Sequence, residues 1–165
     1  MSLLRTASIL GAASIATAAL AQEAPIARTA TDSQLKWGGC PEFLPKGCQL
    51  AVLHGDPSKP NADVLLKVPG GSKLARHWHT SAERMVLIAG EMHVTYDGHK
   101  PVVLKAGSYA YGPAKLPHSG ECRSKSPCVL FIAFEGLVDA VPNDAAGGKK
   151  DGAATPRKEV APAKK

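Results

Sequence analysis

From residue 49 onward, the chain consists of short apolar runs interrupted by Gly, Pro and Asp. The runs are about four to eight residues long and recur every ten residues or so, which is typical of all-β sandwiches and barrels. No window of about eleven or more residues after Gln22 shows a helical period. We therefore predict strands at 49–53, 62–68, 74–79, 83–89, 91–96, 102–105, 108–111 and 128–135.

This number of strands is compatible with a jelly-roll barrel, among other all-β architectures. The Asp97-Gly98 pair is a hairpin signal between two of the runs. We assign the barrel to residues 49–140. Residues 22–48 precede it as a polar lead-in, followed by a loop rich in Gly, Pro and Cys.

The start of the chain has a different pattern. Residues 9–20 form an apolar, Ala-rich run without charge, which ends at Ala19-Leu20-Ala21, an A-x-A cleavage signal. We predict a secretory signal peptide at 1–21, cleaved after Ala21, because the run is too short to remain as a membrane span. The run has no polar face, which disfavours an amphipathic helix of a cytosolic protein. We expect a periplasmic or secreted protein without a lipid anchor, since Gln22 follows the cut.

Positive charge is concentrated at the other end. The formal net charge is +6, and residues 145–165 contribute +4 through six Lys or Arg against two acidic residues. Val160 is the one large apolar residue there, so we predict a disordered basic tail at 141–165. The rest of the chain has no basic patch interleaved with aromatic residues, which argues against a nucleic-acid partner. A weak attraction of the tail to anionic surfaces is compatible with its charge.

Four cysteines, an even number, agree with export. Cys40 and Cys48 bracket seven residues, and Cys122 and Cys128 bracket five. Of the three possible pairings, we favour the two local ones, each stabilising by about 2–3 kcal/mol. A thiolate zinc site is disfavoured by the absence of C-x-x-C spacing. Free buried thiols are the alternative if the chain is not exported.

Candidate chemistry is concentrated around two histidines. On a strand, His77 and His79 point to the same face, because side chains alternate. The spacer 80–82 is long enough to turn the chain and return Glu83 to the same point, and His118 lies downstream. Three imidazoles and a carboxylate can hold a divalent transition metal: iron, manganese, copper, nickel, cobalt or zinc. An octahedral ion would keep two positions open for water, dioxygen or substrate.

These residues carry a resemblance to the cupin superfamily. Its first motif, G-x5-H-x-H-x3-4-E-x6-G, is matched without a gap by Gly71, His77, His79, Glu83 and Gly90. Its second motif, G-x5-P-x-G-x2-H-x3-N, is matched at Gly107, Pro113 and His118, whereas Lys115 and Cys122 replace a Gly and the Asn. The resemblance, closest to secreted single-domain bacterial cupins, implies a double-stranded β-helix, or jelly-roll barrel, with a metal held by His77, His79, Glu83 and His118.

The resemblance also implies a small-molecule ligand or substrate and favours a dioxygenase-like oxidoreductase. A metal-dependent isomerase or lyase stays open, as does a non-enzymatic periplasmic module that binds a metal or a small ligand, because a fold does not decide function. No acid or base beyond the ligands stands out, so no catalytic residue is assigned. Many cupins are dimers, which leaves a homodimer open. No stable membrane insertion is expected after cleavage.

Other polar and aromatic residues near the motifs are assigned structural roles. Arg76 and Arg84 neighbour ligands in sequence and should point away from the metal, because strand side chains alternate. Tyr109 and Tyr111 share a face, and we expect them to pack in the core. The remaining histidines are expected at the surface or in structural contacts: His54, His93 and His99.

Overall fold

The computed structural model describes residues 23–143, which form eleven strands and no helix. The predicted signal peptide and residues 144–165 of the predicted tail lie outside this range. Within residues 23–143, therefore, no helix could cross a membrane.

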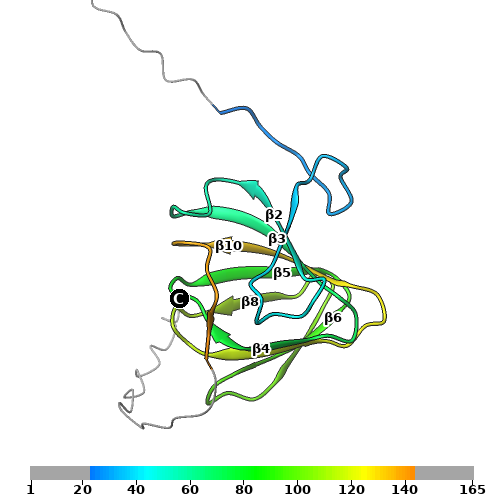
Figure 1. Ribbon diagram of the computed structural model, residues 1–165, viewed down its shortest axis with the longest axis vertical. Helices are drawn as coiled ribbons and strands as arrows, with labels where there is room; N and C mark the ends of the chain where they lie inside the picture. The colour runs from blue at the N-terminus through cyan, green and yellow to red at the C-terminus, as the bar shows by residue number, and fades with distance from the viewer. Residues whose placement is uncertain (1–22, 144–165) are drawn as a thin grey trace, which may run out of the picture.

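The strands form two antiparallel sheets packed against each other (Figure 1). In spatial order, the six-stranded sheet contains β1 (Trp37–Gly39), β2 (Gln49–His54), β3 (Ala62–Val68), β10 (Cys128–Phe134), β5 (Glu83–Ala89) and β8 (Tyr109–Gly112). The five-stranded sheet contains β11 (Val141–Pro142), β4 (Lys73–Trp78), β9 (His118–Cys122), β6 (Glu91–Tyr96) and β7 (Val102–Lys105). Some neighbouring strands, such as β3 and β10, are distant in sequence. The two packed antiparallel sheets confirm the predicted jelly-roll fold.

Each predicted run coincides with a strand to within one residue at either end. Three strands, β1, β9 and β11, were not predicted. The most important of them is β9, which lies between β4 and β6 in the five-stranded sheet. Its sequence, HSGEC, contains no large aliphatic residue, and its buried positions are His118, Gly120 and Cys122. Apolar patterning could not detect it, because packing rather than intrinsic propensity determines this strand.

Strand alternation directs two of the candidate ligands to the interior. In β5, Glu83 is buried on the same face as Met85 and Leu87, while Arg84 between them is exposed. In β9, His118 is buried and the residue after it is half-buried. The alternation of side chains along each strand therefore places these polar side chains on the same buried face as the apolar core residues.

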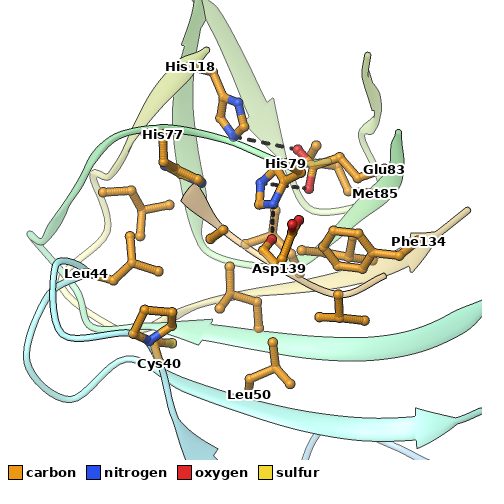
Figure 2. A pocket seen from close by; sticks show the side chains of 18 of the residues that line it. Cys40, Leu44, Leu50, His77, His79, Glu83, Met85, His118, Phe134 and Asp139 are labelled. Atoms are coloured by element: carbon orange, nitrogen blue, oxygen red, sulfur yellow. Dashed lines mark hydrogen bonds and ion pairs between the residues drawn. The ribbon is translucent and has the colours of Figure 1, made fainter. Parts of the chain in front are cut away.

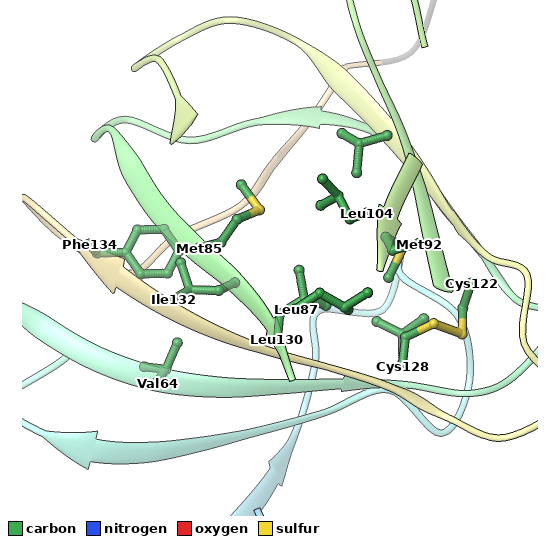
Figure 3. Packing of buried hydrophobic residues seen from close by; sticks show 12 residues of the cluster. Val64, Met85, Leu87, Met92, Leu104, Cys122, Cys128, Leu130, Ile132 and Phe134 are labelled. Carbon is green, nitrogen blue, oxygen red and sulfur yellow. A yellow bond between two sulfur atoms is a disulfide. The ribbon is translucent and has the colours of Figure 1, made fainter. Parts of the chain in front are cut away.

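Twelve buried side chains from both sheets fill the space between them (Figure 3). Leu87 is fully buried near the middle of this core. At one end of the cluster lies the disulfide between Cys122 and Cys128. At the other end, Met85 and Phe134 also line an internal cavity. Met92, which lies beside the disulfide, lines the cavity as well, so the cavity wall is part of this core.

Both predicted disulfides are present. Cys40–Cys48 closes the loop between β1 and β2, and Cys122–Cys128 joins β9 to β10 and therefore one sheet to the other. Cys122 and Cys128 are completely buried. The second bridge is consequently part of the core, whereas the first holds a loop in place.

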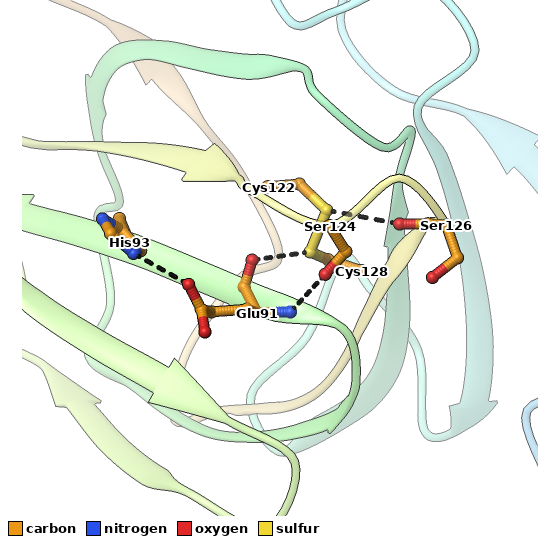
Figure 4. The surroundings of a disulfide bond; sticks show 6 residues. All are labelled: Glu91, His93, Cys122, Ser124, Ser126 and Cys128. Carbon is orange, nitrogen blue, oxygen red and sulfur yellow. Dashed lines mark hydrogen bonds and ion pairs between the residues drawn. A yellow bond between two sulfur atoms is a disulfide. The ribbon is translucent and has the colours of Figure 1, made fainter.

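The turn between β5 and β6 packs tightly against the Cys122–Cys128 bridge (Figure 4). The Glu91 amide donates a hydrogen bond of 2.6 Å to Ser124 Oγ, which ties this turn to the β9–β10 loop. Gly90 has a φ of +87°, and a Cβ there would lie 2.8 Å from Cys128 Sγ. Only glycine satisfies both constraints, which gives the last position of the first motif a structural reason.

We predict that the two disulfides differ in their contribution to stability. Replacing both Cys122 and Cys128 by Ala should lower the free energy of unfolding by more than about 3 kcal/mol, because loop-closure entropy and core packing are lost together. The matched control replaces Cys40 and Cys48 by Ala and should cost about 2–3 kcal/mol. Urea denaturation of the three proteins measures the difference. An equal or smaller loss in the core variant would contradict this ranking.

Candidate metal centre

The four predicted ligands come from both sheets. His77 in β4 and His118 in β9 are paired directly across the five-stranded sheet. His79 lies one residue after the end of β4, although the predicted strand 74–79 included it, and Glu83 begins β5 in the opposite sheet. The short connection between β4 and β5 therefore crosses from one sheet to the other. It places a carboxylate opposite the paired histidines.

The three imidazoles converge at one end of the cavity (Figure 2). One ring nitrogen from each of His77, His79 and His118 lies within 4.8 Å of the others. The ring centroids are 4.4 Å apart for His77 and His118, 4.9 Å for His77 and His79, and 5.2 Å for His79 and His118. All three side chains are buried. The structure thus brings together the histidines that the sequence selected.

Glu83 completes this group. Its Oε2 lies 3.6 Å from His79 Nε2, and its Oε1 lies 3.6 Å from His118 Nε2. The side chain is 3% exposed, and Oε1 has no hydrogen-bond partner among the described residues. Gly112 makes room for the carboxylate, since a Cβ there would lie 2.7 Å from Oε1. A buried acceptor without a partner is costly, and a cation beside it would remove that cost.

The backbone orients all three imidazoles in the same way. His77 Nδ1 donates to the carbonyl of Ala75 at 2.7 Å, and His118 Nδ1 donates to that of Leu116 at 3.3 Å. His79 Nδ1 donates to the carbonyl of Asp139. Because a carbonyl only accepts, each Nδ1 carries the proton and each Nε2 keeps its lone pair. Histidine ligands of metals are usually held in this way by a partner on the second nitrogen.

Burial keeps two of the imidazoles neutral. It lowers the pKa of His77 to about 4, with a smaller contribution from His79 in the same direction. It lowers the pKa of His118 to about 3, assisted by His77 and His79. Burial raises the pKa of Glu83, since the carboxylate loses its water. Neutral imidazole is the form that binds metals, so both histidines are ready to act as ligands at neutral pH.

These residues fit a divalent transition ion. Three Nε2 lone pairs and a carboxylate form a nitrogen and oxygen ligand set. Two features of the structure agree with metal binding here: the buried Glu83 Oε1 has no hydrogen-bond partner among the described residues, and the imidazoles are held with Nε2 free. The donor set does not select one metal over another. His77, His79, Glu83 and His118 would hold the ion.

The cavity beside the histidines has a volume of about 270 Å³. Its only polar lining side chains, among the described residues, are the four candidate ligands and Asp139. Asp139 Oδ1 accepts a hydrogen bond of 2.9 Å from the Thr80 amide, so this carboxylate is held next to His79. The sequence analysis missed Asp139, because it follows β10 without any motif around it. It is a candidate acid or base near the cluster.

Tyr96 is a second residue that the sequence analysis did not select. It pairs with His118 across β6 and β9, and their rings are 4.9 Å apart. Its hydroxyl is buried without a hydrogen-bond partner in the described part of the chain. Burial, followed by the nearby Glu83, raises the pKa of this phenol. Tyr96 thus stays protonated and is placed behind the cluster rather than in the cavity lining.

Two predictions about neighbouring residues have different outcomes. Arg76 pairs with Asp97, and Arg84 lies 2.7 Å from Glu135, so both point away from the cluster as predicted. The prediction of core packing for the two tyrosines is wrong, since Tyr109 is 62% and Tyr111 is 50% exposed. They belong to β8, an edge strand whose outer face has no covering layer within residues 23–143.

The other histidines lie outside the cavity. His99 is exposed beside the β6–β7 turn. His54 is exposed and lies 2.9 Å from Glu23, and His93 Nε2 lies 3.1 Å from Glu91 Oε1. These positions agree with the surface and structural roles predicted for them.

A family model described as "Cupin domain" matches residues 64–134. No curated protein matches the sequence significantly. Among solved structures, the DMSP lyase DddQ from Ruegeria pomeroyi DSS-3 is 21% identical, with a TM-score of 0.58 over 69% of this chain and 64% of that chain. The present chain therefore spans slightly less than two thirds of DddQ.

Two further structures have a similar fold. An RmlC-like cupin from Shewanella frigidimarina NCIMB 400 is 22% identical, with a TM-score of 0.52 over 64% of this chain and 87% of that chain. The polyketide cyclase RemF from Streptomyces resistomycificus is 14% identical, with a TM-score of 0.59 over 73% of this chain and 88% of that chain. At these identities, the comparison is one of fold.

We predict that His79→Ala releases most of the bound metal without unfolding the barrel. Its imidazole would supply a direct ligand, and even changes behind a ligand weaken metal binding by about 10–100-fold. Affinity for zinc should therefore fall by more than about 100-fold. Elemental analysis and competition with a chelator measure this, with circular dichroism as the check on folding. His99→Ala is the matched control, and full metal content in His79→Ala would remove the assignment.

We also predict that His77 and His118 stay neutral in the folded, metal-free protein down to about pH 5. The unfolded chain takes up these two protons near pH 6.5, whereas the folded chain does not. Both histidines therefore lower the free energy of unfolding as the pH falls below about 6.5. Nuclear magnetic resonance of the ring carbons over a pH series follows each titration. Ring signals that shift with a midpoint near 6.5 would contradict burial of these two side chains.

Proposed function

Because the chain belongs to the cupin superfamily, we propose that it is an exported metal-binding protein that acts on a small molecule. His77, His79, Glu83 and His118 hold a divalent transition metal at the end of the internal cavity. The reaction is an oxidation of the bound small molecule, of the dioxygenase type. Membership of the cupin family supports both metal binding and a role for the cavity in binding a small molecule. The identity of the metal has to be determined by elemental analysis.

One observation carries this proposal. Three imidazoles, one from each of three positions in the chain, converge within 4.8 Å with their Nδ1 atoms bonded to backbone carbonyls. A satisfied structural histidine would use its polar atoms within the fold, whereas here the Nε2 side of each ring is left for something else. The buried carboxylate of Glu83 stands 3.6 Å from two of these nitrogens.

Export is supported by two features. The Ala-rich first segment with its Ala19-Leu20-Ala21 signal is typical of a cleaved leader. All four cysteines are paired in disulfides, and such bonds persist mainly in oxidising compartments. A chain folded outside the cytoplasm would acquire its metal there.

The chain's own residues prepare the site for chemistry. The backbone carbonyls of Ala75, Leu116 and Asp139 fix the imidazole rings, so little reorganisation accompanies binding. The cavity wall is mainly apolar, and a low local dielectric strengthens electrostatic interactions beside it. A redox-active ion bound here would pass electrons from the bound substrate, which is oxidised, to dioxygen, both atoms of which would enter the product; a redox-inert ion would act as a Lewis acid.

The position of Asp139 favours a second candidate, a metal-dependent isomerase or lyase. Its carboxylate lines the cavity beside His79 and is held by the Thr80 amide. A carboxylate at this place can accept a proton from a bound molecule, which is the step that such reactions need. The two candidates differ in whether dioxygen is consumed.

We predict dioxygen consumption by the iron- or copper-loaded protein in the presence of a catechol, flavonol or thiol, and none by the zinc-loaded protein. The His79→Ala variant should lose the activity together with the metal. An oxygen electrode and elemental analysis measure both on the same samples. Asp139→Asn separates the candidates, since only proton-transfer chemistry depends on that carboxylate.

Other outcomes point away from oxidation. Turnover of a substrate without dioxygen, lost in Asp139→Asn, would favour the isomerase or lyase. Tight zinc binding with no turnover under any metal would favour a non-enzymatic binding module. Absence of a stoichiometric metal in the properly folded protein would refute the proposed function altogether.

A further inference from the structure

The cavity separates polar from apolar groups. Its polar side chains, the histidine cluster with Glu83 and Asp139, gather at one end (Figure 2). Leu50 lies away from the imidazoles, toward the opposite side of the same cavity, whereas Leu44 lies on the His77 side. Within residues 23–143, the lining contains no Lys or Arg, and no hydroxyl or amide side chain. A molecule inside would find polar partners at one end only.

Part of the backbone at the apolar end is hydrogen-bonded within the chain. Residues 40–48, which we call the cap, form the disulfide-closed loop between β1 and β2 and contribute Pro41 and Leu44 to the lining. Within the cap, the amide of Leu44 donates to the carbonyl of Pro41, and the amide of Cys48 donates to that of Pro45. The Phe43 ring lies 6.0 Å from the His77 ring, so the cap extends along the cavity from its apolar end to the histidine cluster. The cap is therefore an apolar wall of the site.

This arrangement discriminates strongly between possible ligands. A charged or hydrogen-bonding group carried at the far end of a ligand would lie against apolar side chains without a polar side-chain partner, which is costly. Sugars, dicarboxylates and nucleotides carry such groups along their whole length. A hydrocarbon body would instead lose only apolar surface to the wall, which is favourable. The volume of about 270 Å³ is just below that of pockets for drug-sized molecules.

We propose that the ligand of this site is a small amphipathic molecule with a single polar end. The polar end faces His77, His79, Glu83 and His118, and the uncharged hydrocarbon body lies against the cap and the leucine-lined wall. This inference rests on the proposed function for the orientation of the polar end. The selection against a second polar group follows from the wall alone.

The test uses matched pairs that differ only at the far end. Hexanoate is compared with adipate, which carries a carboxylate at each end, and hexanol with the hexanediol that carries a hydroxyl at each end. Titration calorimetry on the zinc-loaded and the metal-free protein gives the affinities. We expect hexanoate to bind the zinc-loaded protein at least about 100-fold more tightly than adipate, and hexanol to bind both forms at least about 10-fold more tightly than the diol.

A substitution in the cap should largely abolish the preference of the zinc-loaded protein for hexanoate over adipate. Leu44 is half-buried in a loop outside the buried core, so Leu44→Lys is not expected to disturb the barrel. Its ammonium would give the far carboxylate of adipate a partner, so adipate should gain and hexanoate should lose about 10-fold each. Val103→Lys is the matched control, since Val103 is 49% exposed on β7 and does not line the cavity. It should leave all four affinities unchanged.

The outcomes separate this inference from the proposed function. One outcome is that the protein holds no stoichiometric metal, while the metal-free protein still binds hexanol more tightly than the diol. This outcome would refute the proposed metal site and leave the inference about the apolar wall intact. Equal affinities within both pairs, a preference for adipate or the diol, or no binding of any of the four would overturn the inference. An effect of Val103→Lys equal to that of Leu44→Lys would overturn it as well, because the cap would then not be the wall that the ligand contacts.

Discussion

The structure depends on the burial of four polar side chains in an otherwise apolar interior. Burial of His77, His79, Glu83 and His118 without full hydrogen bonding costs free energy, and the protein reduces this cost from outside the cluster. Backbone carbonyls accept from the Nδ1 side of each ring, and the lone pairs face inward together. The Nε2 lone pairs and the Glu83 carboxylate, which lack a full set of hydrogen-bond partners, face a single point in the cavity. A cation bound at that point would give all four side chains a partner.

The barrel supplies the precision that such a cluster needs. His77 and His118 are held by cross-strand pairing, and Glu83 by its place at the start of β5 in the other sheet. A core of twelve buried side chains and the Cys122–Cys128 bridge fix the distance between the sheets. Packing far from the cluster therefore determines whether the imidazoles and the carboxylate meet. Function and stability share the same scaffold.

Sequence reasoning found what local patterns encode. Alternation and turn residues located the main strands, and the spacing of His77 and His79 with Glu83 selected the residues that the fold brings together. It missed β9 and Asp139, because a small polar strand and a carboxylate from a distant loop acquire their roles only through tertiary contacts. It also placed Tyr109 in the core, since period-two apolarity does not reveal which strand forms the edge of a sheet.

The contact between His79 and Asp139 has a consequence for the order of maturation. Asp139 comes after the first ten of the eleven strands, and its carbonyl accepts a hydrogen bond from the ring of His79 sixty residues earlier. An exported chain that emerges from its N-terminus first would deliver this residue nearly last. The barrel could therefore collapse before the site becomes competent, and a chain stalled in transit would hold an imidazole that is still free to rotate. The metal cluster would then be completed only after most of the barrel has been delivered.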